Sequence, residues 1–328
     1  MRNWLLCATI VSQYMKKWIV GLLLILILTV SAIYIFTPSK IVISSISTAR
    51  GNIFGEFRTI TQEDKWEKWW RDENGKPHVA GEPFTYGGTR FRLVKHSYHV
   101  AGIEIDQQGL KQQSILHLIS FRLDSTGAVW QCEIPTGMNP LSRVRNHINA
   151  SGIKEKMDAV MKNFSSFVSK PENIYGMAII RVSTVDTTML SSRYTSAAYP
   201  TTPEIYSYFD EVEKNIQKQK GTVAGYPIMN VRKLENDSFE TEVAIPTNHR
   251  LNNDGKFIFQ RMIPGNFMTG EVKGGTYTAN EALKQLELFI ADYNRAKIAN
   301  AFQSLVTNRL NEPDTSKWIT KVYIPVVQ

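Results

Sequence analysis

The chain has 328 residues, of which 43% are hydrophobic and 21% charged, and its net charge is +8. This length and composition exclude a disordered or low-complexity chain and predict about two domains with cores of their own. The charge does not indicate nucleic-acid binding, because residues 171–328 carry 17 basic and 17 acidic residues and no Lys/Arg-rich run occurs. We therefore expect no nucleic-acid partner.

Residues 18–36, "WIVGLLLILILTVSAIYIF", form an uncharged apolar run about as long as the roughly 20 residues that a helix needs to cross a bilayer. An uncleaved transmembrane anchor is favoured over a signal peptide, because cleavage after "VSA" would leave the apolar "IYIF" at a new N-terminus. Lys16 and Lys17 precede the run, so the positive-inside rule predicts a cytoplasmic N-terminus (1–17) and extracytoplasmic domains. The predicted location is the inner, or cytoplasmic, membrane of a bacterium.

The start of the chain is open to two interpretations. Residues 1–14 are either part of the natural protein or an extension from an upstream codon, because "MKKWIV" resembles a natural start.

Cysteines and histidines predict neither a disulfide nor a metal site. Cys7 and Cys132 would lie on opposite sides of the membrane, and two cysteines are too few for a cysteine zinc site. His96, His99 and His117 fall in predicted strands without a ligand triad, and His96 and His99 are expected to point to opposite faces of the sheet. We predict no metal and no cofactor.

The segment 37–170 alternates between short strand patterns and helical patterns. "IVISSIS" is typical of a strand, and Trp66, Trp69 and Trp70 have the i, i+3, i+4 spacing of one helix face. Four alternating stretches between residues 89 and 134 then predict an antiparallel meander. A long helix follows, with Asn139 as its N-cap, Pro140 at its first position and Pro171 at its end.

This order of elements, with pieces such as "KWEKWW" and "AVWQCEIPTGMNPLSR", resembles the SRPBCC superfamily of START-like and polyketide-cyclase proteins over about residues 38–170. The resemblance implies a helix-grip fold, in which an antiparallel sheet wraps around the long C-terminal helix. It also implies an apolar cavity that holds a hydrophobic ligand in relatives. The alternative is that core side chains fill this space, and the tryptophan cluster fits either a core or a lid.

The segment 171–328 contains an internal duplication. "TEVAIPT" (241–247) returns as "TKVYIPV" (320–326), and residues 201–216 align with residues 278–293. Both aligned helices begin with a Thr-x-x-Glu capping box. Each copy is predicted to run strand, helix, strand, strand, with "YGMAIIRVSTV" and "GNFMTGEVKGG" as the strands ahead of the helices. The repeats cover about 172–247 and 261–328, and a pseudo-twofold axis would combine them into one α+β unit with a concave open face.

Alternation divides the side chains of the doubled strand between two faces. The predicted helix-facing set is Val243, Ile245, Val322 and Ile324. The groove or solvent face then receives the residues between them, which are Glu242, Ala244, Lys321 and Tyr323.

Residues 172–327 resemble the GyrI-like, or AraC-type effector-binding, domain of bacterial transcription activators, on "NFMTGEVKGGTYTANEAL", "EPDTSKW" and "TKVYIPV". The resemblance implies a groove between the repeats that binds flat or amphipathic molecules. It carries aromatic wall positions onto Tyr277, Phe302, Trp318 and Tyr323. With Tyr226, Glu242, Glu271 and Lys321 these four complete the candidate ligand-binding residues.

Lys321 departs from the family pattern, which has Glu in "TEIYIPV"-like endings. Glu242 is the equivalent residue of the first repeat, so Glu242 and Lys321 are expected either to pair or to bind opposite ends of a zwitterionic or carboxylate ligand. Glu271 and Arg181 could add to this polar set. An argument for cationic ligands is weaker here than in the family.

The sequence predicts a membrane-anchored protein that binds, sequesters or senses a small hydrophobic or amphipathic molecule, with an unseen signalling partner if it is a sensor. The alternative is a hydrolase or cyclase of a reactive small molecule, with Glu242 and pocket tyrosines in acid-base roles. No Ser/His/Asp arrangement, phosphate loop or metal-ligand set favours that alternative. No helix-turn-helix precedes the second domain, so the regulator role of its relatives does not transfer directly.

Overall fold

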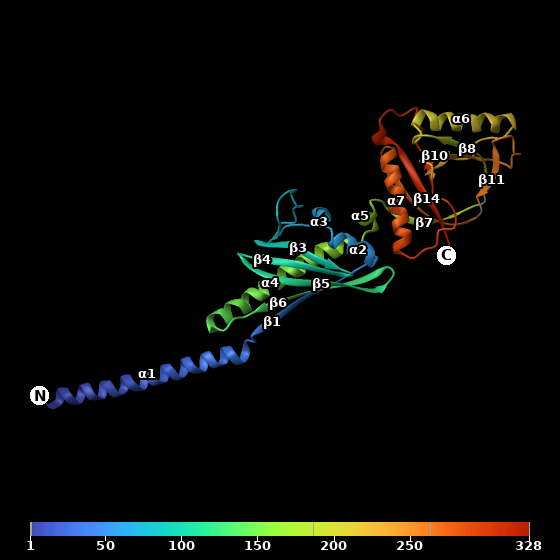
Figure 1. Ribbon diagram of the computed structural model, residues 1–328. Helices are drawn as coiled ribbons and strands as arrows, with labels where there is room; N and C mark the ends of the chain where they lie inside the picture. The colour runs from blue at the N-terminus through green and yellow to red at the C-terminus, as the bar shows by residue number, and fades with distance from the viewer. Residues whose placement is uncertain (1, 186, 263, 328) are drawn as a thin grey trace. The chain divides into compact units, whose positions relative to one another are not determined.

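The computed structural model describes residues 2–185, 187–262 and 264–327, with side chains from residue 17 onward. It divides into two compact units, one of Met1–Ala49 with Phe57–Phe167 and one of Arg50–Glu56 with Val168–Gln328. Each unit contains helices and one curled antiparallel sheet (Figure 1). The mixed α+β class is therefore confirmed.

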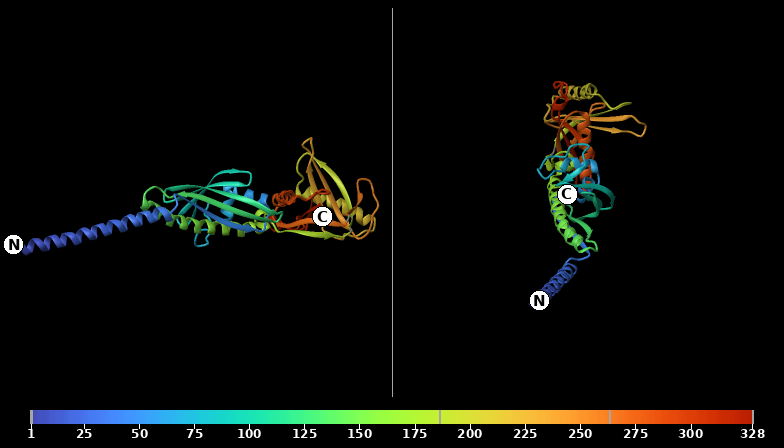
Figure 2. Two further views of the ribbon diagram at one scale, coloured as in Figure 1. Left: turned by 90° about the horizontal axis from the view of Figure 1, so that it is seen from below. Right: turned by 90° about the vertical axis from the view of Figure 1, so that its left-hand side faces the viewer.

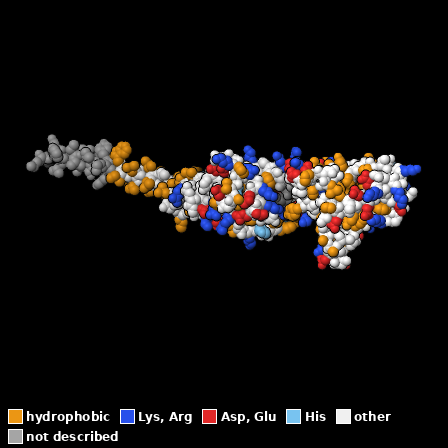
Figure 3. Space-filling model, turned by 90° about the horizontal axis from the view of Figure 1, so that it is seen from above, with side chains coloured by type: hydrophobic (Ala, Val, Ile, Leu, Met, Phe, Trp, Pro, Cys, Tyr) orange, Lys and Arg blue, Asp and Glu red, His pale blue; other side chains and the backbone are white. Residues whose placement is uncertain are grey.

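The chain begins with one long helix, α1 (Arg2–Phe36). Its segment Lys17–Phe36 is long and apolar enough to cross a membrane by length and composition, and none of it is buried. Figure 3 shows hydrophobic side chains gathered over the described part of α1. Cys7 lies where side chains are not described.

The first unit is a six-stranded antiparallel sheet that curves around a long helix (Figure 2). Its strand order is β1-β6-β5-β4-β3-β2. The strands are β1 (Lys40–Ala49), β2 (Phe84–Tyr86), β3 (Thr89–Ser97), β4 (Val100–Gln107), β5 (Leu110–Arg122) and β6 (Ser125–Pro135). The helices that follow α1 are α2 (Ile53–Ile60), α3 (Glu63–Trp69) and α4 (Pro140–Val168).

The first unit's elements follow from its sequence pattern. In β5 the buried Ser114, Leu116 and Leu118 alternate with exposed residues, so one face of the sheet packs inward. Asn139 caps α4 as predicted, because its Oδ1 accepts a hydrogen bond from the Leu141 N–H at 2.9 Å.

Aromatic side chains fill the space between this sheet and its helices. Trp66 is fully buried and stacks on Trp70 with 5.5 Å between ring centroids, while Trp69 contacts Phe164 of α4 at 5.2 Å. The Trp66 Nε1–H donates to the Ile60 carbonyl oxygen at 2.8 Å. The tryptophan cluster is thus core, as one of the two sequence interpretations holds. A hollow beside α4, lined in part by Ile134 and Ile153, measures only about 90 Å³.

The histidines differ from the sequence prediction. His99 lies in the turn after β3, with a positive φ of 58°, rather than on a strand. The rings of His96 and His99 both lie edge-on to Phe57, at 6.5 and 5.7 Å between centroids, so they do not point to opposite faces of the sheet. Within the described residues, no group of three His, Cys, Asp or Glu side chains is arranged to hold a metal ion.

Cys132 is a free, buried thiol on β6. Burial, with a smaller effect of Glu133, raises the pKa of this thiol to about 11. Only the thiolate is alkylated, so in the folded Cys7→Ser protein at pH 8 we expect alkylation at least about a hundredfold slower than in denaturant. A maleimide mass-shift assay measures this, and the rate should rise as the pH approaches 11. Equal rates in folded and unfolded protein would contradict the burial.

The second unit has an eight-stranded antiparallel sheet in the order β11-β8-β10-β9-β13-β14-β12-β7. Its strands are β7 (Ile179–Thr184), β8 (Thr187–Ser196), β9 (Ile228–Lys233), β10 (Phe239–Thr247), β11 (Ile258–Met262), β12 (Gly265–Lys273), β13 (Phe302–Leu305) and β14 (Ile319–Val326). Its helices are α5 (Pro171–Tyr175), α6 (Thr202–Lys218), α7 (Thr276–Asp292) and the 3-10 helix η1 (Thr315–Lys317).

Exchanging β7 with β11, β8 with β12, β9 with β13 and β10 with β14 gives the same strand order, read from the opposite edge of the sheet. The order is therefore consistent with the predicted duplication. One assignment was wrong. The strand equivalent to "GNFMTGEVK" (β12) is β8, a strand the sequence analysis missed, since both β8 and β12 directly precede a helix and pair with the last strand of their copy. "YGMAIIRVSTV" contains β7, which instead pairs with β12 of the other copy.

The predicted helix-facing residues are confirmed. Val243 and Ile245 are buried with side chains of α6, including Phe209. Val322 and Ile324 are buried with side chains of α7, including Leu286. The doubled strand therefore forms the floor of two matching helix–sheet cores.

The two helices begin differently. At α6 the predicted capping box is present, because Thr201 Oγ1 accepts from the Glu204 N–H and the Glu204 carboxylate accepts from the Thr201 N–H at 2.7 Å. At α7 the box at Thr278 is absent, because the helix already begins at Thr276 with Gly275 as its N-cap. Gly274 has φ of 149°, which favours glycine and lets the chain enter the helix early.

This difference predicts unequal effects of the same substitution. Thr201→Ala removes a side-chain cap and should destabilise the second unit by about 1 kcal/mol. Thr278→Ala, the matched control, removes no cap and should cost clearly less. Denaturant midpoints of the two variants measure the difference, and an equal loss in both would contradict the observed caps.

Candidate ligand-binding cavity

A cavity of about 490 Å³ lies on the groove face of the second unit's sheet, the face of Glu242 and Ala244, opposite α6. Its described lining comes from β8 to β12, from Pro264 between β11 and β12, from residues 298–302 and from Pro325 of β14. Most of it is apolar: Met189, Ile228, Met229, Ala244, Met262, Pro264, Phe267, Ile298, Ala299, Ala301, Phe302 and Pro325. The polar lining is Arg193, Asn230, Glu242, Gln260, Arg261, Asn266 and Asn300.

One side of the cavity ends at a cluster of three rings. Phe302 stacks on Tyr323 with 5.1 Å between centroids and 15° between planes. Phe267 meets both rings edge-on, at 6.1 and 6.4 Å. These rings come from neighbouring strands, since Phe302 lies opposite Tyr323 in the ladder. Phe302 and Phe267 reach the cavity, whereas Tyr323 lies behind them.

The strand registers explain why the cavity has this position. Matching the two copies through Glu242 and Lys321 makes Met189, Ile228 and Ala244 the equivalents of Phe267, Phe302 and Tyr323. Smaller side chains therefore occupy the first copy where rings fill the second. Ala244 matters most, because a single methyl group stands where the second copy has a phenol.

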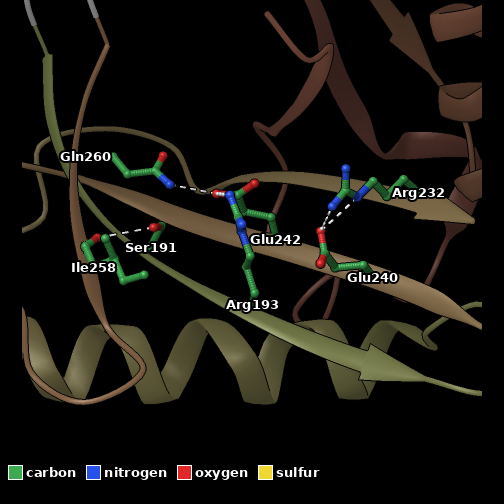
Figure 4. A network of polar contacts seen from close by, with 7 residues as sticks. All are labelled: Ser191, Arg193, Arg232, Glu240, Glu242, Ile258 and Gln260. Carbon is green, nitrogen blue, oxygen red and sulfur yellow. Dashed lines mark hydrogen bonds and ion pairs between the residues drawn. The ribbon is translucent and has the colours of Figure 1, made fainter. Parts of the chain in front are cut away.

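Glu242 is the single carboxylate among the described lining residues. Its Oε1 accepts a hydrogen bond from Gln260 Nε2 at 2.7 Å, and Arg193 Nη2 lies 3.4 Å from the same oxygen (Figure 4). The Glu242 side chain is only 20% exposed. A partly buried, already paired carboxylate offers a ligand a hydrogen-bond acceptor more readily than an unbalanced negative charge.

Lys321 does not pair with Glu242, which corrects one sequence expectation. Lys321 lies 3.7 Å from Glu271, its cross-strand neighbour on β12, and Glu242 pairs with Arg193, its cross-strand neighbour on β8. The two copies thus contain the same cross-strand ion pair with its charges exchanged. The substitution of Lys for Glu in the doubled strand is balanced by Glu271 in place of Arg193.

The structure brings Glu242 and Phe302 to the cavity and places the other candidate ligand residues elsewhere. Tyr226 and Tyr277 are 54% and 81% exposed. Trp318 is buried, and its Nε1–H donates to the Glu312 carbonyl oxygen at 2.8 Å. Tyr323 supports Phe302 from behind. Trp318 lies just before β14, and the guanidinium carbon of Arg309 lies 4.9 Å from the centroid of its ring.

Sequence reasoning missed Met189, Arg193 and Gln260 because it missed β8 and gave β11 no role. One signal was available. "TTMLSSRYT" precedes its helix at nearly the same spacing as "GNFMTGEVK", which aligns Met189 with Phe267 and Arg193 with Glu271.

Comparisons with known proteins give structural likeness only. No family model and no curated protein matches the chain. The chain is similar to the C-terminal domain of EcmrR, at 16% identity and a TM-score of 0.38, over 46% of this chain and 98% of that one. It is similar to SAV2435 bound to tetraphenylphosphonium, at 13% identity and a TM-score of 0.30, over 46% of this chain and 94% of that one. It is also similar to a hydrolase from Listeria innocua, at 7% identity and a TM-score of 0.35, over 45% of this chain and 91% of that one. At these scores the matches carry no argument about ligand or activity.

Proposed function

We propose that the chain is a membrane-anchored, extracytoplasmic protein that binds a small, mainly apolar or amphipathic molecule in the cavity of its second unit. The main support for this function is the cavity itself, which is apolar over most of its described lining and contains one carboxylate. Its volume of about 490 Å³ falls within the range of small-molecule sites, roughly 300 to 1,000 Å³.

We propose further that residues 171–328 form a GyrI-like effector-binding domain and residues 37–170 an SRPBCC-like helix-grip domain. Support for the first is the symmetric strand order together with the resemblance of "NFMTGEVKGGTYTANEAL" and "TKVYIPV". Support for the second is a curved antiparallel sheet around one long helix. In this chain the second unit is the proposed ligand carrier, because aromatic side chains occupy the interior of the first.

The charges around the cavity favour a neutral or zwitterionic ligand over a simple cation. Arg193 and Arg261 line the cavity beside Glu242. A cation would have to compete with Arg193 for the Glu242 carboxylate, whereas a hydrogen-bond donor can add to it. The apolar part of the ligand would lie against Met189, Ala244 and Phe302.

Binding is favoured over catalysis by the chemistry of the lining. Its described residues include no Ser, Thr, Cys, His, Lys or Tyr, so Glu242 has no nucleophile or second acid-base group beside it. Turnover of a bound compound that is lost in Glu242→Gln would instead support a hydrolase.

The anchor is proposed from α1. Its apolar segment is about 30 Å long at 1.5 Å per residue, which matches the hydrocarbon core of a bilayer. Trp18 lies at one end and Tyr34 and Phe36 at the other, where aromatic side chains favour the membrane interfaces. We propose the N-terminus in the cytoplasm. A reporter fused after residue 328 that proves cytoplasmic would contradict this orientation.

Thermal shift with a panel of aromatic amphiphiles tests the binding function. The panel should contain neutral, zwitterionic, cationic and anionic members of similar size. At least one neutral or zwitterionic member should raise the melting temperature of the purified full chain in a concentration-dependent way. No shift with any member would remove the support for binding, and a preference for cations would overturn the charge argument.

A further inference from the structure

The first turns of α4 expose apolar side chains to an unusual degree. Leu141 is 78% exposed, Ile148 66% and Val144 39%, and Met138, just before the helix, is 90% exposed. Leu141, Val144 and Ile148 are spaced i, i+3 and i+7, so they lie on one helix face. The opposite face, with Ala150 and Ile153, is buried in the core of the first unit. We call the set Met138, Leu141, Val144 and Ile148 the α4 apolar face.

The α4 apolar face is confined to one end of the helix. The next positions on the same face are Ser151 and Glu155, seven residues after Val144 and Ile148, and both are exposed. The helix is therefore apolar on its outside for its first turns only and polar beyond them. Whatever covers the apolar face lies at the N-terminal end of α4.

That end of α4 is attached to the end of α1. The guanidinium carbon of Arg143 lies 4.4 Å from the centroid of the Tyr34 ring, and Arg143 Nη1 donates to the Thr37 carbonyl oxygen at 2.9 Å. The Tyr34 hydroxyl donates to the Met138 carbonyl oxygen. These contacts place the α4 apolar face beside the point where the apolar helix α1 stops.

We propose that the α4 apolar face inserts into the interfacial layer of the membrane leaflet from which α1 emerges. This inference rests on the proposed span of α1. Two features favour lipid as the occupant. Phe36 at the end of α1 is 81% exposed, so both of the helix ends that meet here expose apolar side chains. Arg145 is four residues from Leu141 at the border of the face, where its guanidinium can contact lipid phosphate.

The consequence is a second membrane contact for the first unit. If α1 were its only membrane contact, the first unit could rotate relative to the bilayer. A second contact through the α4 apolar face would fix its orientation. The α4 apolar face is therefore a membrane-contact surface of the first unit and not a ligand site.

Site-specific fluorescence in proteoliposomes tests this proposal with the full chain. In a Cys7→Ser background, Leu141→Cys and Ile148→Cys are labelled with an environment-sensitive fluorophore, and Glu155→Cys on the same helix face is the matched control. Cys132 is buried and remains unlabelled in the folded protein. We expect blue-shifted emission at 141 and 148, and quenching by nitroxide-labelled lipid about twofold or more stronger than at 155.

Each other outcome overturns the proposal in a recognisable way. Equal quenching at the three positions, in protein that resists alkaline carbonate extraction, leaves the span intact and removes the α4 contact. Blue-shifted emission without lipid quenching identifies a protein surface, such as a second copy, as the occupant. Protein that carbonate releases from the vesicles contradicts the proposed span and this inference together.

Discussion

Ala244→Tyr is expected to weaken binding of a cavity ligand by at least about tenfold, which corresponds to about 1.4 kcal/mol. The substitution places a phenol where the second copy has Tyr323, and its ring would project into the cavity beside Ile228, the cross-strand neighbour of Ala244. Competition between the new ring and the ligand for the same space is the physical reason. Isothermal titration with the best compound from the thermal shift panel measures the change.

The control for this prediction is Ala197→Tyr, the same chemical change at an exposed position outside the described lining. It should bind like the unaltered protein. Circular dichroism and melting temperature must show that Ala244→Tyr folds. Unchanged affinity in folded Ala244→Tyr protein would mean that the ligand binds elsewhere, and the argument from the two unequal copies would be wrong.

Trp66→Ala is expected to destabilise the first unit by about 3 to 5 kcal/mol. Trp66 is fully buried, stacks on Trp70 and contacts Phe84 at 5.3 Å, so its removal leaves a cavity that rigid neighbouring rings cannot close. Its buried hydrogen bond to the Ile60 carbonyl is also lost. Denaturant unfolding followed by tryptophan fluorescence measures the loss, because most tryptophans of the chain lie in this unit.

Phe121→Ala serves as the comparison, since Phe121 is aromatic but 59% exposed on β5. It should change the free energy of unfolding by about 0.5 kcal/mol or less. A small effect of Trp66→Ala would indicate that the aromatic cluster is loosely packed. The first unit would then regain the ligand cavity that its resemblance to SRPBCC proteins implies.

The spacing of apolar residues within one element was sufficient to predict which of its side chains share a face. The alternation in "TEVAIPT" and "TKVYIPV" predicted Val243 and Val322 as helix-facing residues, because a strand under a helix has one apolar face. The spacing of Trp66, Trp69 and Trp70 likewise predicted one aromatic face, and the structure buries it. Both patterns lie within a single element and depend on no other.

The site was less predictable, because it depends on which strands pair. Glu242 pairs with Arg193 because β10 and β8 are aligned in one particular register, and the sequence of either strand alone does not reveal that register. β8 was missed because "TTMLSSRYTS" has few apolar residues, although its partners bury four successive positions of it. The early start of α7 depends on the backbone freedom of Gly274, which the Thr-x-x-Glu pattern does not reveal.

A structure of the full chain with its tightest small-molecule ligand tests the central claim most directly. We predict density for the ligand on the groove face of the second unit, with its apolar part against Met189, Ala244 and Phe302 and a polar group within hydrogen-bond distance of Glu242. A ligand bound in the first unit, or beside Trp318 outside the cavity, would contradict the account.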